Sequence, residues 1–455
     1  MVLDMGWRMC LLVIVSWMAA SCNLAAVPVE VHPGATPENT RPIQTQAGRN
    51  ETVGKIAYIG SDGNIYLWLG SGSAPITLTT DARTTAGTEA GLVSYQEPTW
   101  APTGDQLAWV RSSLLPNQQW EYRLEVYDLS AGASTSFFTS AEQIPFYIYW
   151  SPDASVLSFL SASDEDQMQL WTSVAGGQAQ LIDHGQPYYW TWMEDSESFL
   201  AHIGGSVDRN PKGARLQFVS LGASVPEALV FSPLNFQAPV LSPTGDQILV
   251  VGRSRIGTDG LFLLSLQGEV LARLGAVEGR VAFDYSPSGR YLAVVTGPEV
   301  EGVHIGNLIV VDLVDPGDPH TLPSIAEDVA AFWWSPTQDR LVYLVPGFVP
   351  DNYTQPVSFG AQGDFSLRIQ AQIYDVTQDR SYALTSFVPT KEFFRILPYY
   401  DQYQRSSTIW SPDGSHIVYS ASLNGREPGI FIIDADGGRP PIPVGEGVLA
   451  FWSFE

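Results

Sequence analysis

Two long segments carry most of the side chains that are suited to binding a partner. Both are rich in aromatic residues, and the second also holds Lys391 and Arg405. Aromatic rings beside arginine are typical of protein interfaces, and such rings also stack on sugars. We therefore predict a binding surface for a protein or a glycan; the alternative is that the rings form a small core of the segments themselves. The candidates are Phe348 and Tyr353 in residues 346–364, and Phe393, Phe394, Arg395, Tyr399, Tyr400 and Tyr403 in residues 387–405.

One short acidic run, Asp164, Glu165 and Asp166, offers oxygen ligands of the kind that calcium prefers. The alternative is a solvated turn, the more common role of such a charge run. The six histidines form no HxH, HxxxH or HExxH pair, and no phosphate-binding or dinucleotide-binding glycine motif occurs. We therefore predict no metal site beyond this weak candidate, and no cofactor.

Residues for nucleophilic catalysis are missing from the sequence. The two cysteines, Cys10 and Cys22, both lie near the N-terminus, and no GxSxG sequence occurs. These absences predict that the protein has no catalytic residues and is not an enzyme. The alternative is a carboxylate-dependent hydrolase or lyase that acts on a polysaccharide or peptide at the funnel in the centre of the fold.

The elements that must position these residues follow from an internal repeat. Segments such as YWSPDASVLSFL and IWSPDGSHIVYS place an aromatic residue before a Ser-Pro-Asp-Gly-type turn and alternating apolar residues after it. These residue types suit successive positions of a tight turn, and the alternation has the period of a half-buried strand. The repeat returns about every 40–50 residues, which is typical of a β-propeller. Its anchors, to which we assign a structural role, are Trp100, Trp150, Trp192, Leu241, Tyr285, Trp334, Trp410 and Trp452.

We accordingly predict an all-β fold, a single β-propeller of four-stranded antiparallel blades over residues 53–455. The C-terminal sequence supplies one strand and the sequence from Lys55 supplies three, so pairing residues 447–454 with the strand at Lys55 makes a blade that closes the ring. Closure removes exposed strand edges, which invite aggregation. Eight anchors then predict eight blades, with seven as the alternative. The turns after the anchors emerge on one face, the short-turn face, and the long insertions emerge on the opposite long-loop face.

The repeated SP-[DTS]-G turn resembles that of the TolB-like family of WD-type propeller repeats. This family occurs in periplasmic and exported bacterial proteins and in the propellers of prolyl oligopeptidase relatives. The resemblance runs from about Lys55 to the end of the sequence. It implies the propeller fold, but no single function, because such propellers serve as docking platforms, ligand sites and enzyme scaffolds.

The first residues have the order of a bacterial export signal. Arg8 precedes an apolar run over residues 9–17, and small residues then lead to Cys22. The sequence Ala-Ala-Ser-Cys resembles a lipobox, which implies a cleaved signal peptide over residues 1–21 and a lipid on Cys22. The alternatives are a plain secretory signal or an uncleaved anchor. Residues 22–52 are rich in proline and threonine and are predicted to form a flexible tether, or else an ordered edge segment.

Charge narrows the range of partners. The formal net charge is −25, whereas nucleic-acid binding needs a basic surface and adsorption to anionic lipid is disfavoured by an acidic one. We predict a monomer with no nucleic-acid partner, attached to the membrane through its N-terminal lipid only. The sequence thus predicts a non-catalytic, extracytoplasmic binding or scaffold lipoprotein of the cell envelope, at the periplasm or cell surface. It would dock a protein or glycan of the envelope on its long-loop face.

Overall fold

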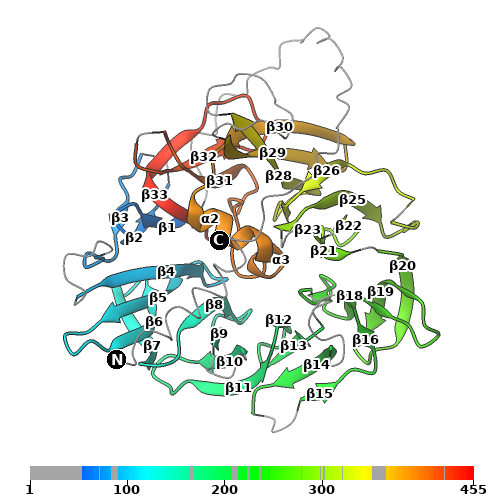
Figure 1. Ribbon diagram of the computed structural model, residues 1–455, viewed down its shortest axis with the longest axis horizontal. Coiled ribbons are helices and arrows are strands. Elements are labelled where there is room, and N and C mark those ends of the chain that lie inside the picture. The colour runs from blue at the N-terminus through cyan, green and yellow to red at the C-terminus, as the bar shows by residue number, and fades with distance from the viewer. Residues whose placement is uncertain are drawn as a thin grey trace.

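The described part of the chain forms a ring of antiparallel sheets around one axis, a β-propeller (Figure 1). Each sheet runs from the axis to the rim, and its strands follow one another outward. The computed structural model describes residues 54–70, 72–83, 91–162, 168–205, 214–222, 226–234, 237–277, 279–297, 299–300, 303–319, 321–350, 365–424 and 426–455.

Five of the sheets have four strands or add a short fifth strand. The first two are β4 (Val93–Trp100), β5 (Gln106–Leu114), β6 (Trp120–Asp128) and β7 (Ala133–Ser140), then β8 (Pro145–Trp150), β9 (Leu157–Ala162), β10 (Met168–Ser173) and β11 (Gln180–Gly185). The third is β12 (Tyr188–Trp192), β13 (Ser198–Ile203), β14 (Arg215–Ser220) and β15 (Glu227–Ala228). The fourth is β16 (Ser232–Pro233), β17 (Val240–Leu241), β18 (Gln247–Arg253), β19 (Asp259–Ser265) and β20 (Val270–Gly275). The fifth is β21 (Arg280–Tyr285), β22 (Tyr291–Gly297), β25 (Gly306–Asp312) and β26 (Ala326–Val329), beside the hairpin of β23 (Glu299–Val300) and β24 (Val303–His304).

The last two sheets complete the ring. One is β27 (Ala331–Trp334), β28 (Arg340–Pro350), β29 (Phe365–Asp375) and β30 (Arg380–Phe387). The other has six strands in the order β3-β2-β1-β33-β32-β31. Its members are β1 (Ile56–Gly60), β2 (Ile65–Trp68), β3 (Ile76–Thr77), β31 (His416–Ala421), β32 (Gly429–Asp434) and β33 (Ile442–Trp452).

The all-β propeller of four-stranded antiparallel blades is confirmed, but the prediction of eight blades is wrong. The described residues form seven sheets of four or more strands, the number that the sequence left as its alternative. The reason is that β33 is 11 residues long and continuous. It pairs with β32 as far as Glu446 and with β1 from Gly447 onward. The terminal strands therefore do not close the ring as a separate blade, because they belong to the same six-stranded sheet as β31 and β32.

The turns after the anchors have the local structure that their residues favour. In the turn after Trp410, the Ser411 hydroxyl donates to Asp413 Oδ1 over 2.7 Å and accepts from the backbone N–H of His416 over 2.9 Å. Gly414 has a φ of +68°, which glycine adopts without strain. Ala154 holds the corresponding position after Trp150 with a φ of +60°, at a cost of about 1 kcal/mol. These turns define the short-turn face.

Most of the anchors are buried, Leu241 and Trp334 are partly buried, and most of the anchors bridge neighbouring sheets. Each bridging indole N–H donates to the carbonyl of the residue that stands immediately before the anchor of the preceding repeat. A buried indole N–H usually has an acceptor, and this bond provides one at each of these anchors. The bonds are Trp100 to Phe451 (3.3 Å), Trp150 to Thr99 (3.3 Å), Trp192 to Tyr149 (3.3 Å), Trp334 to Asp284 (3.0 Å) and Trp410 to Trp333 (2.9 Å).

A short helical insertion between β30 and β31 lies at the centre of the ring (Figure 1). We name residues 390–407 the axial segment. It contains α2 (Lys391–Ile396), a 3-10 turn η1 (Leu397–Tyr399) and α3 (Tyr400–Tyr403). The Thr390 hydroxyl caps α2 by accepting from the backbone N–H of Phe393 over 3.3 Å. Glu392 in the first turn and Arg395 in the last suit the helix dipole.

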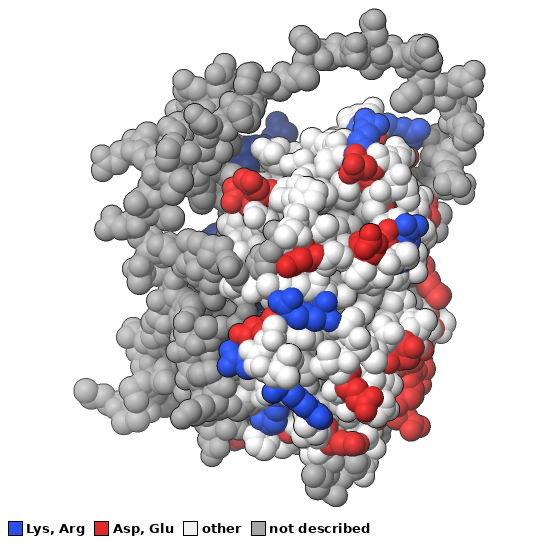
Figure 2. All heavy atoms as spheres, turned by 90° about the vertical axis from the view of Figure 1, so that its right-hand side faces the viewer, with Lys and Arg blue, Asp and Glu red and all other residues white. Residues whose placement is uncertain are grey.

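The rim of the ring carries charges of both signs. Figure 2 shows Lys and Arg side chains interspersed with Asp and Glu on the side that lies to the right in Figure 1. One rim pair joins Arg253 Nε to Asp259 Oδ1 over 2.6 Å, with both side chains about half exposed. Among the described residues, no helix has the length and apolar character that crossing a membrane requires.

Candidate functional site

Two adjoining hollows open on the short-turn face at the ring axis. Both are lined by anchors and by prolines of the turns that follow them, and Phe454 lines both. We name them the axial hollows. The first has a volume of about 170 Å³ and is lined by Asp284, Trp333, Trp334, Pro336, Gln404, Thr408, Trp410, Pro412, Ser453 and Phe454. The second has a volume of about 230 Å³ and is lined by Trp100, Pro102, Tyr149, Trp150, Pro152, Arg405, Ser406 and Phe454.

An ion pair joins the two hollows. Arg405 Nη1, from the end of the axial segment, lies 3.1 Å from Asp284 Oδ1, and both side chains are largely buried. Asp284 Oδ1 also accepts from the backbone N–H of Tyr285 over 2.9 Å. Burial raises the pKa of Asp284, and the positive charge of Arg405 opposes this effect only in part. The hollows therefore place a guanidinium and a carboxyl between apolar, aromatic walls.

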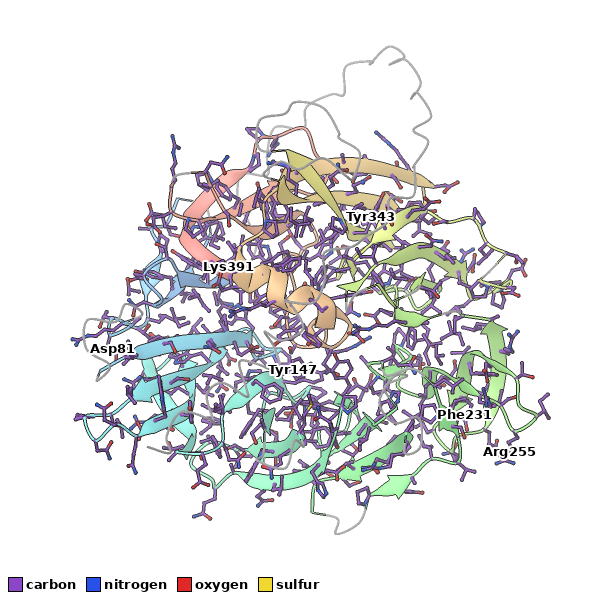
Figure 3. All side chains as sticks on the ribbon, in the orientation of Figure 1. Asp81, Tyr147, Phe231, Arg255, Tyr343 and Lys391 are labelled. Carbon is purple, nitrogen blue, oxygen red and sulfur yellow. The ribbon has the colours of Figure 1, made fainter. Side chains whose placement is uncertain are left out.

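Neutral hydrogen bonds fix the axial segment to the sheets that begin with β8 and β12. Gln402 Nε2 donates to the hydroxyl of Tyr147 over 2.6 Å and to the carbonyl of Trp190 over 3.0 Å. The Gln402 side-chain oxygen accepts from the backbone N–H of Trp190 over 3.2 Å. Figure 3 shows Tyr147 pointing toward the centre of the ring, where α2 also lies. These contacts hold the residues before Arg405 in place.

Glu97 contacts the same segment from β4. The hydroxyl of Tyr403 donates to Glu97 Oε1 over 3.1 Å. Burial raises the pKa of Glu97 to about 7, although the bond from Tyr403 lowers it. Glu97 and Tyr147 both have positive φ angles, 56° and 45°, at irregularities of β4 and β8. Such bulges redirect a side chain, and here they accompany two side chains that bond to the axial segment.

Charged contacts fix the axial segment to the other side of the ring. Asp401 Oδ2 accepts from the backbone N–H of Ala238 over 3.2 Å. Asp401 Oδ1 also lies 3.9 Å from Arg280 Nη2, which donates to the carbonyl of Pro398 over 2.6 Å. Burial raises the pKa of Asp401, while Arg280 and Arg405 lower it. The positive charge of Arg280 and the hydrogen bond from Ala238 together compensate for the burial of this carboxylate.

The sequence-predicted binding residues are divided between the core and the surface. Phe393 and Tyr400 are each 1% exposed, so they pack within the fold rather than face a partner. Phe394 and Tyr403 are half-buried, and Arg395 and Tyr399 are exposed. The side chain of Phe348 and the whole of Tyr353 lie outside the described residues. The burial of Phe393 and Tyr400 agrees with the alternative of an internal core for this segment.

Several other sequence predictions concern residues outside the described part. These are the signal peptide, Cys22 and the tether, together with the acidic run Asp164, Glu165 and Asp166. Among the residues that the structure describes, no group of three His, Cys, Asp or Glu side chains is placed to hold a metal ion.

Sequence reasoning missed the axial hollows because it treated the anchors as structural only. Asp284, Tyr149 and Trp333 each stand one residue before an anchor, and all three line the hollows. The residue type at this position changes from repeat to repeat, whereas the anchors are mostly tryptophan. This variation was the one sign in the sequence that the position could serve a function. Arg405 was noted within the long insertion, but its pairing with a residue 121 positions away was not visible in the sequence.

No family model matches the chain. A stretch of 139 residues is 31% identical to a protein of Bacillus subtilis (strain 168) described as "uncharacterized peptidase YuxL". The match covers 28% of this chain and 20% of the relative, so the chain spans about a fifth of that protein's length.

Solved structures with a similar fold include propeller proteins of different activities. Dihydro-heme d1 dehydrogenase NirN matches with a TM-score of 0.51 at 13% identity, over 91% of this chain and 77% of that one. TolB from Acinetobacter baumannii matches with a TM-score of 0.34 at 15% identity, over 80% and 83%. An oligogalacturonate lyase in complex with manganese matches with a TM-score of 0.45 at 13% identity, over 84% and 98%. These likenesses concern the fold alone.

The prediction that the chain is not an enzyme needs correction. It rested on missing motifs, but the matching stretch of sequence occurs in a protein described as a peptidase. The lack of a nucleophile motif in this sequence is therefore not a sufficient reason to classify the protein as a non-enzyme.

Proposed function

We propose that the protein binds a peptide segment of a partner protein at the axial hollows. The observation that carries this proposal is the pair of aromatic hollows on either side of the Arg405–Asp284 ion pair. Sites for whole drug-sized ligands occupy about 300–1,000 Å³. The hollows are smaller, at about 170 and 230 Å³, so each has room for about one side chain. A peptide fits this arrangement because two of its side chains can enter the hollows while its polar backbone meets the ion pair.

We place this activity at the bacterial cell envelope. The export signal and the cysteine at position 22 support attachment to a membrane by a lipid. In this proposal residues 22–52 tether a monomeric propeller outside the cytoplasm. Cys22→Ala should release the protein from membranes; a variant that stays bound and uncleaved would contradict lipid attachment.

A peptide array tests the binding proposal. We expect the propeller to bind a subset of peptides, and Phe454→Ala to weaken that binding at least tenfold because it removes a wall of both hollows. Tyr399→Ala is the matched control, since Tyr399 is an exposed aromatic residue on the axial segment. Loss of binding in Tyr399→Ala alone would move the site to the surface that the sequence favoured, and binding only to a parallel array of glycans would contradict a peptide ligand.

A second candidate function is hydrolysis of the bound peptide. The observation that favours it is Asp284, a carboxyl of raised pKa that lines the first hollow, because such groups serve in proton transfer. The partial likeness to a protein described as a peptidase supports it further. Peptides bound on the array are incubated with the protein and analysed by mass spectrometry. Cleavage that Asp284→Asn abolishes would support hydrolysis, and intact peptides would contradict it.

A further inference from the structure

We infer that the axial hollows recognise a carboxylate, and specifically the free C-terminal carboxylate of the peptide. The inference rests on the proposed function and names the chemical group that the same site binds. It starts from four buried hydrogen-bond donors on residues that line the hollows. None of the four has an acceptor among the described residues.

Arg405 presents an unused pair of donors. Its Nη1 is paired with Asp284, but Nε and Nη2 are buried and find no acceptor among the described residues. Nε and Nη2 lie on one edge of the planar guanidinium, the edge that binds both oxygens of a carboxylate. A buried donor without an acceptor costs about 1–3 kcal/mol, so an acceptor brought by a ligand is stabilised at this edge.

Two residues that line the first hollow carry further buried donors without an acceptor among the described residues. Trp333 is only 4% exposed, and its indole N–H has no acceptor in the described part of the chain. The side-chain nitrogen of the neighbouring Gln404 is also buried and unpaired there. Both residues line the hollow that Asp284 lines, and Asp284 binds Arg405. The four unpaired donors therefore belong to residues that line the two hollows, which Asp284 and Arg405 link.

A carboxylate matches this set of donors. Its two oxygens accept about four hydrogen bonds and donate none. Among the described lining residues, Arg405 supplies the one positive charge and Asp284 the one negative charge. A group of single negative charge is therefore favoured over a phosphate, which would place more negative charge beside Asp284. The apolar walls leave room for the last side chains of the peptide.

The test is an array that carries every pair of C-terminal residues on a common peptide, each as the free acid and as the amide. We expect the free acids to bind and the matching amides to bind at least tenfold more weakly. Equal binding of acids and amides would overturn the inference while the proposed peptide function stands. Binding of neither form would contradict both. A parallel array of uronic-acid oligosaccharides tests the other source of a carboxylate, and binding there alone would overturn the peptide terminus.

Solution titration of the strongest free-acid peptide then tests the residues, with tryptophan fluorescence as the readout. Arg405→Lys keeps the charge but loses the planar edge, and should weaken binding about tenfold or more. Trp333→Phe keeps the packing but loses the N–H, and should weaken binding severalfold. Asp284→Asn removes the opposing negative charge and should strengthen it. Unchanged affinity in all three folded variants would overturn the inference.

Arg253→Lys is the matched control for Arg405→Lys, because Arg253 forms an exposed ion pair on the rim. It should leave the affinity unchanged. Thermal unfolding of each variant separates loss of the site from loss of the fold. Trp333→Phe keeps the inference testable if Arg405→Lys fails to fold.

Discussion

The ring holds its sheets together in two different ways. Five junctions between neighbouring sheets are bridged by the indole N–H of an anchor. The two junctions on either side of the sheet that contains β17 and β18 lack this bond, because their anchors are Leu241 and Tyr285. Leu241 has no donor, and the buried hydroxyl of Tyr285 has no partner among the described residues.

The axial segment makes its charged contacts on the side where the indole bonds are missing. Asp401 binds the backbone of Ala238 and faces Arg280, and Arg405 binds Asp284. Toward the tryptophan-anchored sheets its contacts include hydrogen bonds of Gln402, of Tyr403 with Glu97 and of Thr390 with the Val448 carbonyl. The two junctions without an indole bond are therefore also bridged through the axis, in addition to the 3.1 Å hydrogen bond between the His202 ring and the Gln237 carbonyl at one of them.

The largest effect is expected from Asp401→Ala. It removes the carboxylate that faces Arg280 and the acceptor of the Ala238 N–H, and one-sided loss of a buried ion pair costs about 3–5 kcal/mol. The free energy of unfolding in urea measures this loss. Asp312→Ala is the control, because the Arg290–Asp312 pair is exposed and should contribute little. Equal losses in the two variants would break the comparison.

The next effect is a pH dependence that arises at Glu97. Its pKa is raised to about 7 in the folded protein, whereas an unfolded glutamate titrates near 4.3. The folded state thus binds the proton more tightly, so the free energy of unfolding should fall as the pH rises from about 4.3 to 7, by up to about 3.7 kcal/mol. Urea unfolding across this range should show a smaller fall in Glu97→Gln. Parallel curves would mean that Glu97 does not titrate in this way.

A smaller effect is expected from Trp150→Phe, which removes one indole bond. The loss of the hydrogen bond to the Thr99 carbonyl and of part of the packing should cost about 2 kcal/mol. Chemical denaturation measures it, and hydrogen exchange should show faster opening at the two sheets that this bond joins. A cost near zero would mean that the indole bond does not hold the junction.

The smallest effect is expected from Tyr285→Phe, at a junction without an indole bond. Removing a buried hydroxyl that has no partner in the described chain should leave stability unchanged or raise it by about 1 kcal/mol. The same denaturation experiment checks this. A clear loss of stability would show that the hydroxyl does bind a neighbour, and the two kinds of junction would then be alike.

The sequence predicts those parts of the fold, such as the repeated turns, that depend on residues close to one another in the chain. Ser411, Asp413 and Gly414 specify their turn by local conformation and hydrogen bonding, and the recurrence of such turns identifies the propeller. The number of sheets was not predictable in the same way. It depends on whether the chain between Ile442 and Trp452 bends into two strands or runs on as one, and its alternating apolar residues allow either.

The site depended on contacts between distant residues. Tyr403 and Glu97 are 306 positions apart, and Gln402 and Tyr147 are 255 apart. Nothing in the local pattern of residues 387–405 separates a surface loop from a segment that folds into the axis. Its aromatic residues suit both, and the outcome is decided by the space that the assembled ring leaves at its centre.

The six-stranded sheet has a consequence for how the chain reaches its fold on the ribosome. The backbone N–H of Lys55 donates to the hydroxyl of Ser453, 398 positions later, and β1 pairs with β33 along the same edge. β1 is therefore synthesised long before the strand with which it pairs along this edge. Pairing across such a separation is slow, so β1 keeps an edge without this partner, of the kind that can pair with other chains, until β33 emerges.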